Sequence, residues 1–359
     1  MHPVFTVSML KEYLHAEKHD KWLSLTGKAR QVAILGHISP DGDAMGSTLA
    51  MAHYLRRKGK LVQVIVPTSY PDFLAWLPGA GDVLVYEYAK QAVYQYISDT
   101  DLVICMDFNS VKRLEQLSRI VQNHHAPMIT IDHHLSPDED VDLLVSDPSA
   151  SSTCEIVFSL LYQLEGMDAF TEEMAECIYC GMMTDTGSFT YNSNRSELFY
   201  IISLLLSKGI DKDRIYRNVY HSFSVSRLRL EGYILHRKMQ YFQDDHAALF
   251  TLTREEMKEF QYKKGDAEGF VNLPLQIRGT RLSISLREDT EKDLVRVSLR
   301  SVDDFPCNRM AEDFFNGGGH LNASGGHLPM PMDKAVEVAQ KAIEAYRPLL
   351  RRQDNVIKN

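Results

Sequence analysis

The sequence predicts an α/β protein built from two domains, and two observations support this fold class. In the first half of the chain, short apolar runs typical of buried strands alternate with stretches of helical periodicity, as in a parallel sheet with flanking helices. In the second half, the runs 282–287 and 294–300 alternate apolar and polar residues, as strands with one solvated face do. We expect a first domain at 1–195, a helical linker at 196–237 and a smaller α/β domain at 238–359.

The composition and charge exclude several classes of protein. With 44% hydrophobic residues over 359 positions, the chain can bury two cores. Its net charge of −9 argues against binding long nucleic acid, which relies on a broad basic surface. The longest apolar stretches, such as 198–206, are too short to cross a bilayer, and the amino terminus lacks the pattern of a secretory signal. We therefore expect a cytoplasmic protein.

The five cysteines are an odd number and lie mostly in apolar or helical segments, which fits buried reduced thiols better than disulfides. Cys177 and Cys180 have the spacing of a CxxC motif. Neither a second CxxC nor the strand-then-helix context of a redox motif accompanies them. We therefore expect no redox or zinc site there.

The elements of the first domain follow from local patterns. An amphipathic helix beginning at residue 7 is expected to pack on the sheet. The apolar run 32–35 predicts the first strand, and the periodicity of 48–57 predicts a helix. The β-branched run 61–66 predicts a second strand, which Pro67 closes. Strand, helix and strand in this order imply a right-handed parallel crossover.

A tight turn at 35–47 joins the first strand to its helix. It presents one imidazole and two carboxylates a few residues apart, those of His37, Asp41 and Asp43. This crowding favours a cation between the side chains, because like charges oppose each other's ionisation. The alternative is that the two aspartates only form turn and helix-cap hydrogen bonds.

Two later strands also end in polar side chains. The run 101–106 leads into Asp107, and the next strand leads into Asp132, His133 and His134. Because the carboxyl ends of parallel strands line one crevice, we expect these side chains to converge with those of the tight turn on a metal site. Taken singly, Asp107 could cap a helix and the histidines could be surface residues.

Asp185 is a further acidic candidate. It follows the apolar helical stretch 175–183, where the helix dipole disfavours a negative charge, so a nearby cation would explain it. Alternatively, Asp185 is only a turn residue at the carboxyl end of a helix. His124 and His125 precede a strand at its amino end, and we expect them to face away from the crevice.

In the second domain, a predicted strand ends at Arg300 and Ser301. After it comes a run of three glycines, which includes Gly318 and Gly319, and then His320. Consecutive glycines leave backbone N–H groups able to point at an anion. Together with Arg300 and His320 they predict a substrate clamp, although Arg300 could instead be a solvated charge at a strand end. The remaining elements are predicted at 247–252, a strand, and 333–346, a helix.

In combination, these motifs resemble those of the DHH phosphoesterases that carry a C-terminal DHHA1 domain. The resemblance covers most of the chain and rests on these positions: His37, Asp41, Asp43, Asp107, Asp132, His133, His134, Asp185, Gly317, Gly318, Gly319, His320, Ala323, Ser324 and Gly325. Within the family, the chain is most similar to the nano-RNase group of oligoribonucleases and 3′-phosphoadenosine-5′-phosphate phosphatases. The resemblance implies a parallel-sheet DHH domain, a smaller α/β DHHA1 domain and an active site in the cleft between them.

The resemblance also implies two metal ions that share Asp107. Their ligands would be His37, Asp41 and Asp107 for one ion, and Asp43, Asp107, His133 and Asp185 for the other. Asp132 would orient the neighbouring imidazole, and His134 would contact the substrate phosphate, so Asp107, Asp132 and His134 form the implied catalytic group. Mixed imidazole and carboxylate ligands suit Mn²⁺, with Mg²⁺ a weaker candidate.

The implied activity is hydrolysis of short linear RNA or DNA oligonucleotides to mononucleotides and dephosphorylation of 3′-phosphoadenosine-5′-phosphate. The implied substrate-binding residues are His134, Arg300, Ser301, Gly318, Gly319 and His320. An alternative is a cyclic-dinucleotide phosphodiesterase, but such relatives usually carry an N-terminal membrane and sensor region, which we do not expect here. A binding module without catalysis would lack a ligand, whereas every expected position is filled. We expect neither long nucleic acid nor a membrane as partner, and a homodimer is a possible assembly.

Overall fold

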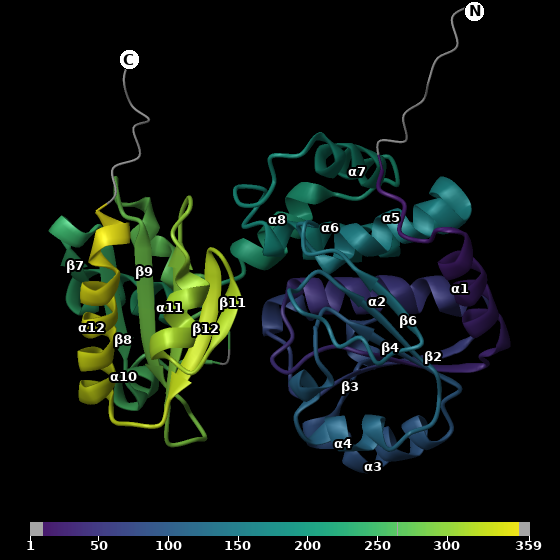
Figure 1. The fold of residues 1–359 in the computed structure, drawn as a ribbon, viewed down its shortest axis with the longest axis horizontal. Helices are drawn as coiled ribbons and strands as arrows, with labels where there is room; N and C mark the ends of the chain where they lie inside the picture. The colour runs from purple at the N-terminus through teal and green to yellow at the C-terminus, as the bar shows by residue number, and fades with distance from the viewer. Residues whose placement is uncertain (1–9, 264, 352–359) are drawn as a thin grey trace, which may run out of the picture. The chain divides into compact units, whose positions relative to one another are not determined.

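The computed structural model describes residues 10–263 and 265–351, and the chain divides into two compact units, Met1–Ser222 and Phe223–Asn359 (Figure 1). Each unit has its own sheet and its own core, which confirms the predicted α/β class. The predicted start of the first helix at residue 7 lies outside the described residues. Within them, α1 spans Ala16–Lys28.

The first unit contains a six-stranded parallel sheet with the strand order β3-β2-β1-β4-β5-β6. Its strands are β1 (Gln31–Leu35), β2 (Leu61–Val66), β3 (Leu84–Val85), β4 (Leu102–Met106), β5 (Met128–Asp132) and β6 (Leu143–Ser146). The chain runs outward from β1 to β2 and β3 and then returns to β4 on the other side of β1. The carboxyl ends of β1 and β4 therefore form a topological switch point, which is where open α/β sheets bind their ligands.

Helices cover both faces of this sheet, which explains why all five residues of β4 are buried. The helices of this unit are α1, α2 (Gly42–Arg57), α3 (Tyr86–Ser98), α4 (Gln116–Gln122), α5 (Thr153–Glu165), α6 (Glu172–Asp185), α7 (Ser196–Leu206) and α8 (Lys212–Tyr220), of which α7 and α8 pack on α6. On one face, Ala33 and Val103 share a core with side chains of α3 and α4 (Figure 1). On the other face, Ile34 and Ile104 share a larger core with α2, α5 and α6.

Helix α2 starts earlier than the sequence suggested. It begins at Gly42 and not at residue 48, so the predicted turn at 35–47 is shorter and Asp43 lies in the first helical turn. The reason is an N-cap: the side chain of Asp41 accepts hydrogen bonds from the backbone N–H groups of Asp43 and Ala44. The cap fixes the backbone that carries both aspartates.

Helix α2 packs closely against α6, and a glycine permits the contact. A Cβ atom at Gly46 would lie 2.4 Å from the backbone oxygen of Cys177 and 3.0 Å from Sγ of Cys154. Any larger residue would push the two helices apart. This contact brings the amino end of α2 near the carboxyl end of α6, where Asp185 lies.

The second unit contains a mixed six-stranded sheet with the order β11-β12-β10-β9-β8-β7. Its strands are β7 (Gln240–Phe242), β8 (Ala247–Leu252), β9 (Leu282–Glu288), β10 (Val295–Ser301), β11 (Gly318–His320) and β12 (Ala323–Leu328). Only β8 and β9 pair in parallel among these described strands; the other neighbours are antiparallel. The sequence predicts no strand at β11, because glycine is depleted in strands.

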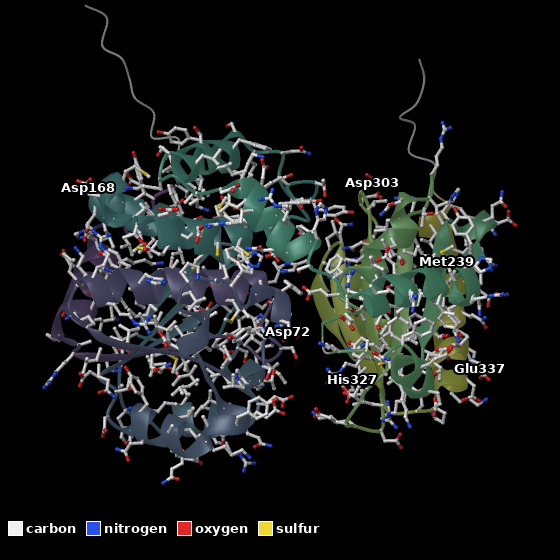
Figure 2. All side chains as sticks on the ribbon, turned by 180° about the vertical axis from the view of Figure 1, so that it is seen from behind. Asp72, Asp168, Met239, Asp303, His327 and Glu337 are labelled. Carbon is white, nitrogen blue, oxygen red and sulfur yellow. The ribbon has the colours of Figure 1, made fainter. Side chains whose placement is uncertain are left out.

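Helices of the second unit are α9 (Val225–Tyr233), α10 (Arg254–Glu259), α11 (Cys307–Phe314) and α12 (Met332–Leu350). Side chains of α11 and α12 pack on one face of the sheet, with Ile284 and Ala339 in the shared core. Exposed His327 on β12 precedes buried Leu328, and exposed Glu337 lies on α12 (Figure 2). Short 3₁₀ turns lie at Asp72–Leu74, Ala80–Asp82, Val111–Leu114, Gly166–Ala169, Gln243–Asp245 and Phe270–Gln276, and a π turn at Ile234–Lys238.

The segment 196–237, expected as a linker, contains α7 and α8 in the first unit and α9 in the second. The domain boundaries at 195 and 237 stay predictions. None of the helices in the described part of the chain has both the length and the apolar character needed to cross a bilayer.

Candidate metal centre

The predicted ligands of the first unit lie at the switch point of its sheet. His37 follows β1, Asp107 follows β4 directly, and Asp132 is the last residue of β5. These three strands are neighbours, so their carboxyl ends place the side chains at one edge of the sheet. Asp185, the last residue of α6, reaches the same place from the helical layer.

Asp107 lies between two groups of potential ligands. Its Oδ2 atom is 3.5 Å from Nε2 of His37, and the same nitrogen is 3.9 Å from Oδ1 of Asp41. Its Oδ1 atom is 3.6 Å from Nε2 of His133. The two oxygens of one carboxylate therefore face two different imidazoles, as a bridging ligand would.

His133 connects Asp107 to two further carboxylates. Its Nε2 atom lies 3.9 Å from Oδ2 of Asp43 and 3.5 Å from Oδ2 of Asp185. These distances exceed those of good N–H···O hydrogen bonds. Burial would lower the pKa of His133, but the charges of Asp185 and Asp43 outweigh it and raise the pKa. The imidazole thus faces strong negative charge from two sides.

His37, Asp43 and Asp107 are buried, which intensifies the electrostatics of the centre, whereas the side chains of Asp41 and Asp185 are 45% and 29% exposed. The exposed fraction is 2% for Asp107, 1% for Asp43 and 4% for His37. Burial and the charges of Asp43 and Asp41 raise the pKa of Asp107 well above its usual value. Burial also lowers the pKa of His37, which favours the neutral imidazole that metals bind.

The donor set fits divalent cations. Three ligand atoms, one each from His37, Asp41 and Asp107, lie within 4.8 Å of one another, and so do atoms from Asp43, Asp107 and His133. A divalent cation between such carboxylates reverses the repulsion that raises the pKa of Asp107. Imidazole and carboxylate together favour a transition metal over Ca²⁺.

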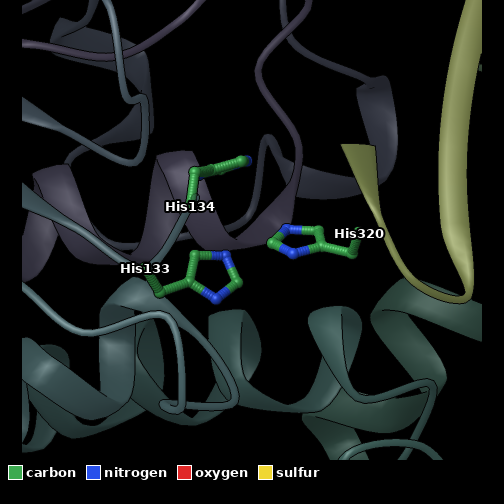
Figure 3. A group of neighbouring side chains, drawn as sticks. All are labelled: His133, His134 and His320. Atoms are coloured by element: carbon green, nitrogen blue, oxygen red, sulfur yellow. The ribbon is translucent and has the colours of Figure 1, made fainter. Parts of the chain in front are cut away.

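His134 is oriented by Asp132. Nδ1 of His134 lies 2.7 Å from Oδ1 of Asp132, and the imidazole rings of His133 and His134 meet edge to face with their centroids 4.8 Å apart (Figure 3). Burial alone would raise the pKa of Asp132, but the hydrogen bond and charge of His134 lower it. Because an ionised carboxylate can only accept, Nδ1 of His134 donates.

The backbone at Asp107 adopts a conformation that is rare for residues other than glycine. Its φ angle is 64°, in the left-handed region. The N–H group of Asp107 donates to the backbone oxygen of Ile131 at 3.0 Å, which continues the β4–β5 pairing past the end of β4. Strain of this kind persists where the surrounding structure determines the conformation, and it is often found at functional sites.

Sequence reasoning missed the residues that hold these carboxylates. The backbone N–H groups of Thr153 and Cys154 donate to the two oxygens of Asp43, at 2.6 and 2.9 Å. The hydroxyl of Thr153 donates to Oδ1 of Asp107 at 2.9 Å. The sequence feature nearest to these residues is the polar segment that caps α5, where Ser152 is the N-cap. That signal predicts a helix start and not which side chains the start will contact.

In the second unit, Arg300 and Ser301 end β10. Nη1 of Arg300 donates to the backbone oxygen of Leu299 at 2.9 Å. Ser301 is buried; its hydroxyl donates to the backbone oxygen of Phe305 at 2.8 Å and accepts from Nδ2 of Asn322 at 2.9 Å. These contacts show that Ser301 stabilises the loop after β10, and its role in substrate binding stays a prediction.

Gly318, Gly319 and His320 form the edge strand β11, which pairs with β12. The φ angle of Gly319 is 141°, and a Cβ atom there would lie 2.6 Å from the backbone oxygen of Ala323. The close approach of β11 and β12 therefore explains why glycine occupies position 319. Anion binding by this run and by His320 stays a prediction.

The pair His124 and His125 lies apart from the centre, and the cysteines are buried thiols. His124 and His125 follow α4 and precede β5, at the amino end of that strand. All five cysteines lie within the described residues and are free and buried. Burial raises the pKa of Cys105 to about 12 and also raises the pKa of Cys177 and Cys180, so these thiols are poor nucleophiles.

The chain is similar to known proteins over most of its length. Residues 31–182 match the model described as DHH family, N-terminal domain, and residues 247–347 match the DHHA1 domain. The bifunctional oligoribonuclease and PAP phosphatase NrnA of Thermus thermophilus is 28% identical over 322 residues, 89% of this chain and 90% of that protein. The protein of the same name from Bacillus subtilis is 27% identical over 81% of this chain and 87% of its own. A solved structure, an exopolyphosphatase-related protein from Bacteroides fragilis, is 49% identical with a TM-score of 0.90, over 96% of this chain and all of that one.

Proposed function

The chain belongs to the DHH family and carries a DHHA1 domain, and on this premise we propose that it is a two-metal phosphoesterase for short nucleotide substrates. The substrates would be linear oligonucleotides of a few residues, hydrolysed to mononucleotides, and 3′-phosphoadenosine-5′-phosphate. The names of the relatives from Thermus thermophilus and Bacillus subtilis support this choice. The net charge of −9 agrees with a preference for short over long nucleic acids.

The observation that carries the proposal is the position of Asp107. One oxygen of its carboxylate faces His37 and the other faces His133, and each imidazole is next to further carboxylates. A structural ion pair would not need a second imidazole on the opposite side of a buried carboxylate. A carboxylate shared by two ions does need donors on both sides.

Two Mn²⁺ ions are the proposed cofactors, with Mg²⁺ as the weaker candidate because imidazole is a poor ligand for it. One ion would be held by His37, Asp41 and Asp107, and the other by Asp43, Asp107, His133 and Asp185. When bound, the pair would supply Lewis acidity to the phosphate and a nucleophilic water at neutral pH.

The chain's own side chains would orient the substrate. Asp132 accepts the Nδ1 proton of His134 and so fixes the ring, and Nε2 of His134 would contact the phosphate that is attacked. The proposed substrate-binding residues of the second unit are Arg300, Ser301, Gly318, Gly319 and His320. Arg300 would pair with a second phosphate of the substrate through its planar guanidinium group.

The test compares three substrates with metal-stripped protein. Release of mononucleotide or phosphate is measured with and without Mn²⁺ on a linear dinucleotide, 3′-phosphoadenosine-5′-phosphate and a cyclic dinucleotide. We expect Mn²⁺-dependent turnover of the first two. Asp107→Asn keeps the shape of the side chain but removes the shared charge, so turnover should fall by about 10³-fold or more, as for the loss of a principal catalytic group.

A dominant activity on the cyclic dinucleotide would instead make the protein a cyclic-dinucleotide phosphodiesterase. Turnover that is equal with and without Mn²⁺ would contradict the two-metal proposal. Activity of Asp107→Asn at the wild-type level would remove Asp107 from the shared position.

A further inference from the structure

Both carboxylate oxygens of Asp43 accept hydrogen bonds from backbone N–H groups of the chain. The N–H group of Thr153 donates to Oδ2 and that of Cys154 to Oδ1, and both residues belong to the first turn of α5. N–H groups in the first turn of a helix have no partner within the helix and carry its positive dipole. They therefore orient Asp43 and stabilise its negative charge.

Thr153 also contacts the second carboxylate of the centre. Its side chain is fully buried, and its hydroxyl donates to Oδ1 of Asp107 at 2.9 Å. The same oxygen faces Nε2 of His133 at 3.6 Å, which leaves Oδ2 directed at His37. The hydroxyl thus determines how the carboxylate of Asp107 is rotated about its side-chain bond.

The segment that carries Thr153 is itself held in place. Glu155 is buried, and its Oε2 atom accepts from the backbone N–H and the hydroxyl of Ser151, at 2.8 and 2.7 Å. Nη2 of Arg195 donates to the same oxygen at 2.5 Å. Ser152 caps α5 by accepting from the N–H of Glu155. With both sides of Thr153 fixed, the backbone that carries its hydroxyl cannot move away from Asp107 without breaking several buried hydrogen bonds.

We propose that Thr153 is a positioning residue of the metal centre, whose N–H group and hydroxyl hold Asp43 and Asp107 so that Asp107 can serve both ions. This inference rests on the two-metal function proposed above. Thr153 itself neither binds an ion nor touches the substrate. Its effect passes through the two carboxylates, in the way that outer hydrogen-bond partners determine the affinity of other metal sites.

The test uses two substitutions of Thr153 in the full-length protein. Thr153→Val has nearly the same shape and keeps the backbone N–H but lacks the hydroxyl, whereas Thr153→Ser keeps the hydroxyl. Mn²⁺ binding to metal-stripped protein is measured by isothermal titration calorimetry. We expect Thr153→Val to bind Mn²⁺ about tenfold more weakly, the lower end of such effects, and Thr153→Ser to stay close to wild type.

A matched control is Thr48→Val in α2. Thr48 is also fully buried, and its hydroxyl lies 2.6 Å from the backbone oxygen of Ala44 and 3.1 Å from that of Met45, so this change removes a buried hydroxyl that bonds to the backbone of its own helix. We expect the Mn²⁺ affinity of Thr48→Val to remain within about twofold of wild type, because the Thr48 hydroxyl does not hold a metal-binding carboxylate.

The outcomes separate this inference from the proposed function. If wild type binds Mn²⁺ and Thr153→Val binds it equally well, the positioning role is wrong while the two-metal function stands. If Thr48→Val weakens binding as much as Thr153→Val, the effect is one of general packing and the inference also fails. If wild-type protein binds no Mn²⁺, the two-metal function fails first, and the role of Thr153 fails with it.

Discussion

Asp107 and Asp289 are both buried, but their surroundings shift the pKa of the carboxyl group in opposite directions. The pKa of Asp107 is raised because it is buried among other acids. Asp289, in the turn between β9 and β10, is buried as well, with 5% exposed. Its Oδ1 accepts from the N–H groups of Glu291 and Lys292 at 2.9 Å each, and Arg296 pairs with its Oδ2. Burial would raise the pKa of Asp289, yet these donors together lower it to about 2.

Asp289→Asn tests this difference. A carboxylate whose pKa is lower in the folded state stabilises the fold above its unfolded pKa of about 3.9, and this stabilisation disappears as the pH falls toward about 2. We expect the substitution to cost about 1–2 kcal/mol at neutral pH, reduced from the full linkage value because Arg296 is partly exposed, and almost nothing near pH 2. Urea unfolding at several pH values measures the difference.

The control is Asp293→Asn in the same turn, where the side chain is fully exposed and 4.0 Å from Arg254. We expect it to change the free energy of unfolding very little at any pH, because exposed ion pairs contribute little. A pH-independent loss for Asp289→Asn would show that its hydrogen bonds, and not its charge, stabilise the turn.

At the scale of elements, the contact between α2 and α6 is the one on which the site depends. Helix α2 carries Asp43, and α6 ends at Asp185. Gly46 lets the helices approach, since its missing side chain leaves room for the backbone of Cys177. Packing of two helices thus brings together ligands that lie far apart in the sequence.

Gly46→Ala should therefore destabilise the first unit although alanine favours helices. The added Cβ would be 2.4 Å from a backbone oxygen, so α2 or α6 must shift, at a cost of about 1–3 kcal/mol. Gly27→Ala in α1 is the matched control, because a Cβ atom there meets nothing within 4 Å. It should stabilise the protein by about 0.5–1 kcal/mol. Thermal unfolding of the two variants should move in opposite directions, and equal shifts would contradict the argument from close packing.

At the scale of the whole molecule, the ligands are confined to one of two units. All six proposed ligand residues, from His37 to Asp185, belong to Met1–Ser222, while Phe223–Asn359 has its own sheet and core. A bound ion stabilises only the folded unit that binds it. The two units should therefore respond differently to metal.

Hydrogen exchange of the metal-stripped protein with and without Mn²⁺ tests this division. We expect protection of amides in β4, β5 and the start of α2 to increase by about 2.7 kcal/mol for each bound ion at 100 times its dissociation constant. Amides in β8 and β9 should keep their exchange rates in the absence of a nucleotide. Equal protection of both units by Mn²⁺ alone would show that metal binding stabilises the chain as one cooperative body.

The sequence alone predicted the fold class and the side chains that converge at the carboxyl edge of the first sheet. Apolar runs such as 102–106 show buried strands directly, and parallel strands must bring Asp107 and Asp132 to one edge. The strands follow from neighbours along the chain, and the rule that parallel strands end at one edge of a sheet supplies the convergence. Local patterns missed the early start of α2, because a cap at Asp41 shortens a turn without changing its composition.

Only the tertiary structure decided how the centre is held. Thr153 lies 110 positions after Asp43 in the sequence, yet its N–H donates to that carboxylate. Gly319 is explained by the approach of β12, which no local pattern of glycines can distinguish from an anion-binding loop. Periodicity shows which face of an element is buried. Which donor meets which oxygen depends on the packing of elements that are distant in the chain, and a hydrogen bond changes over tenths of an ångström.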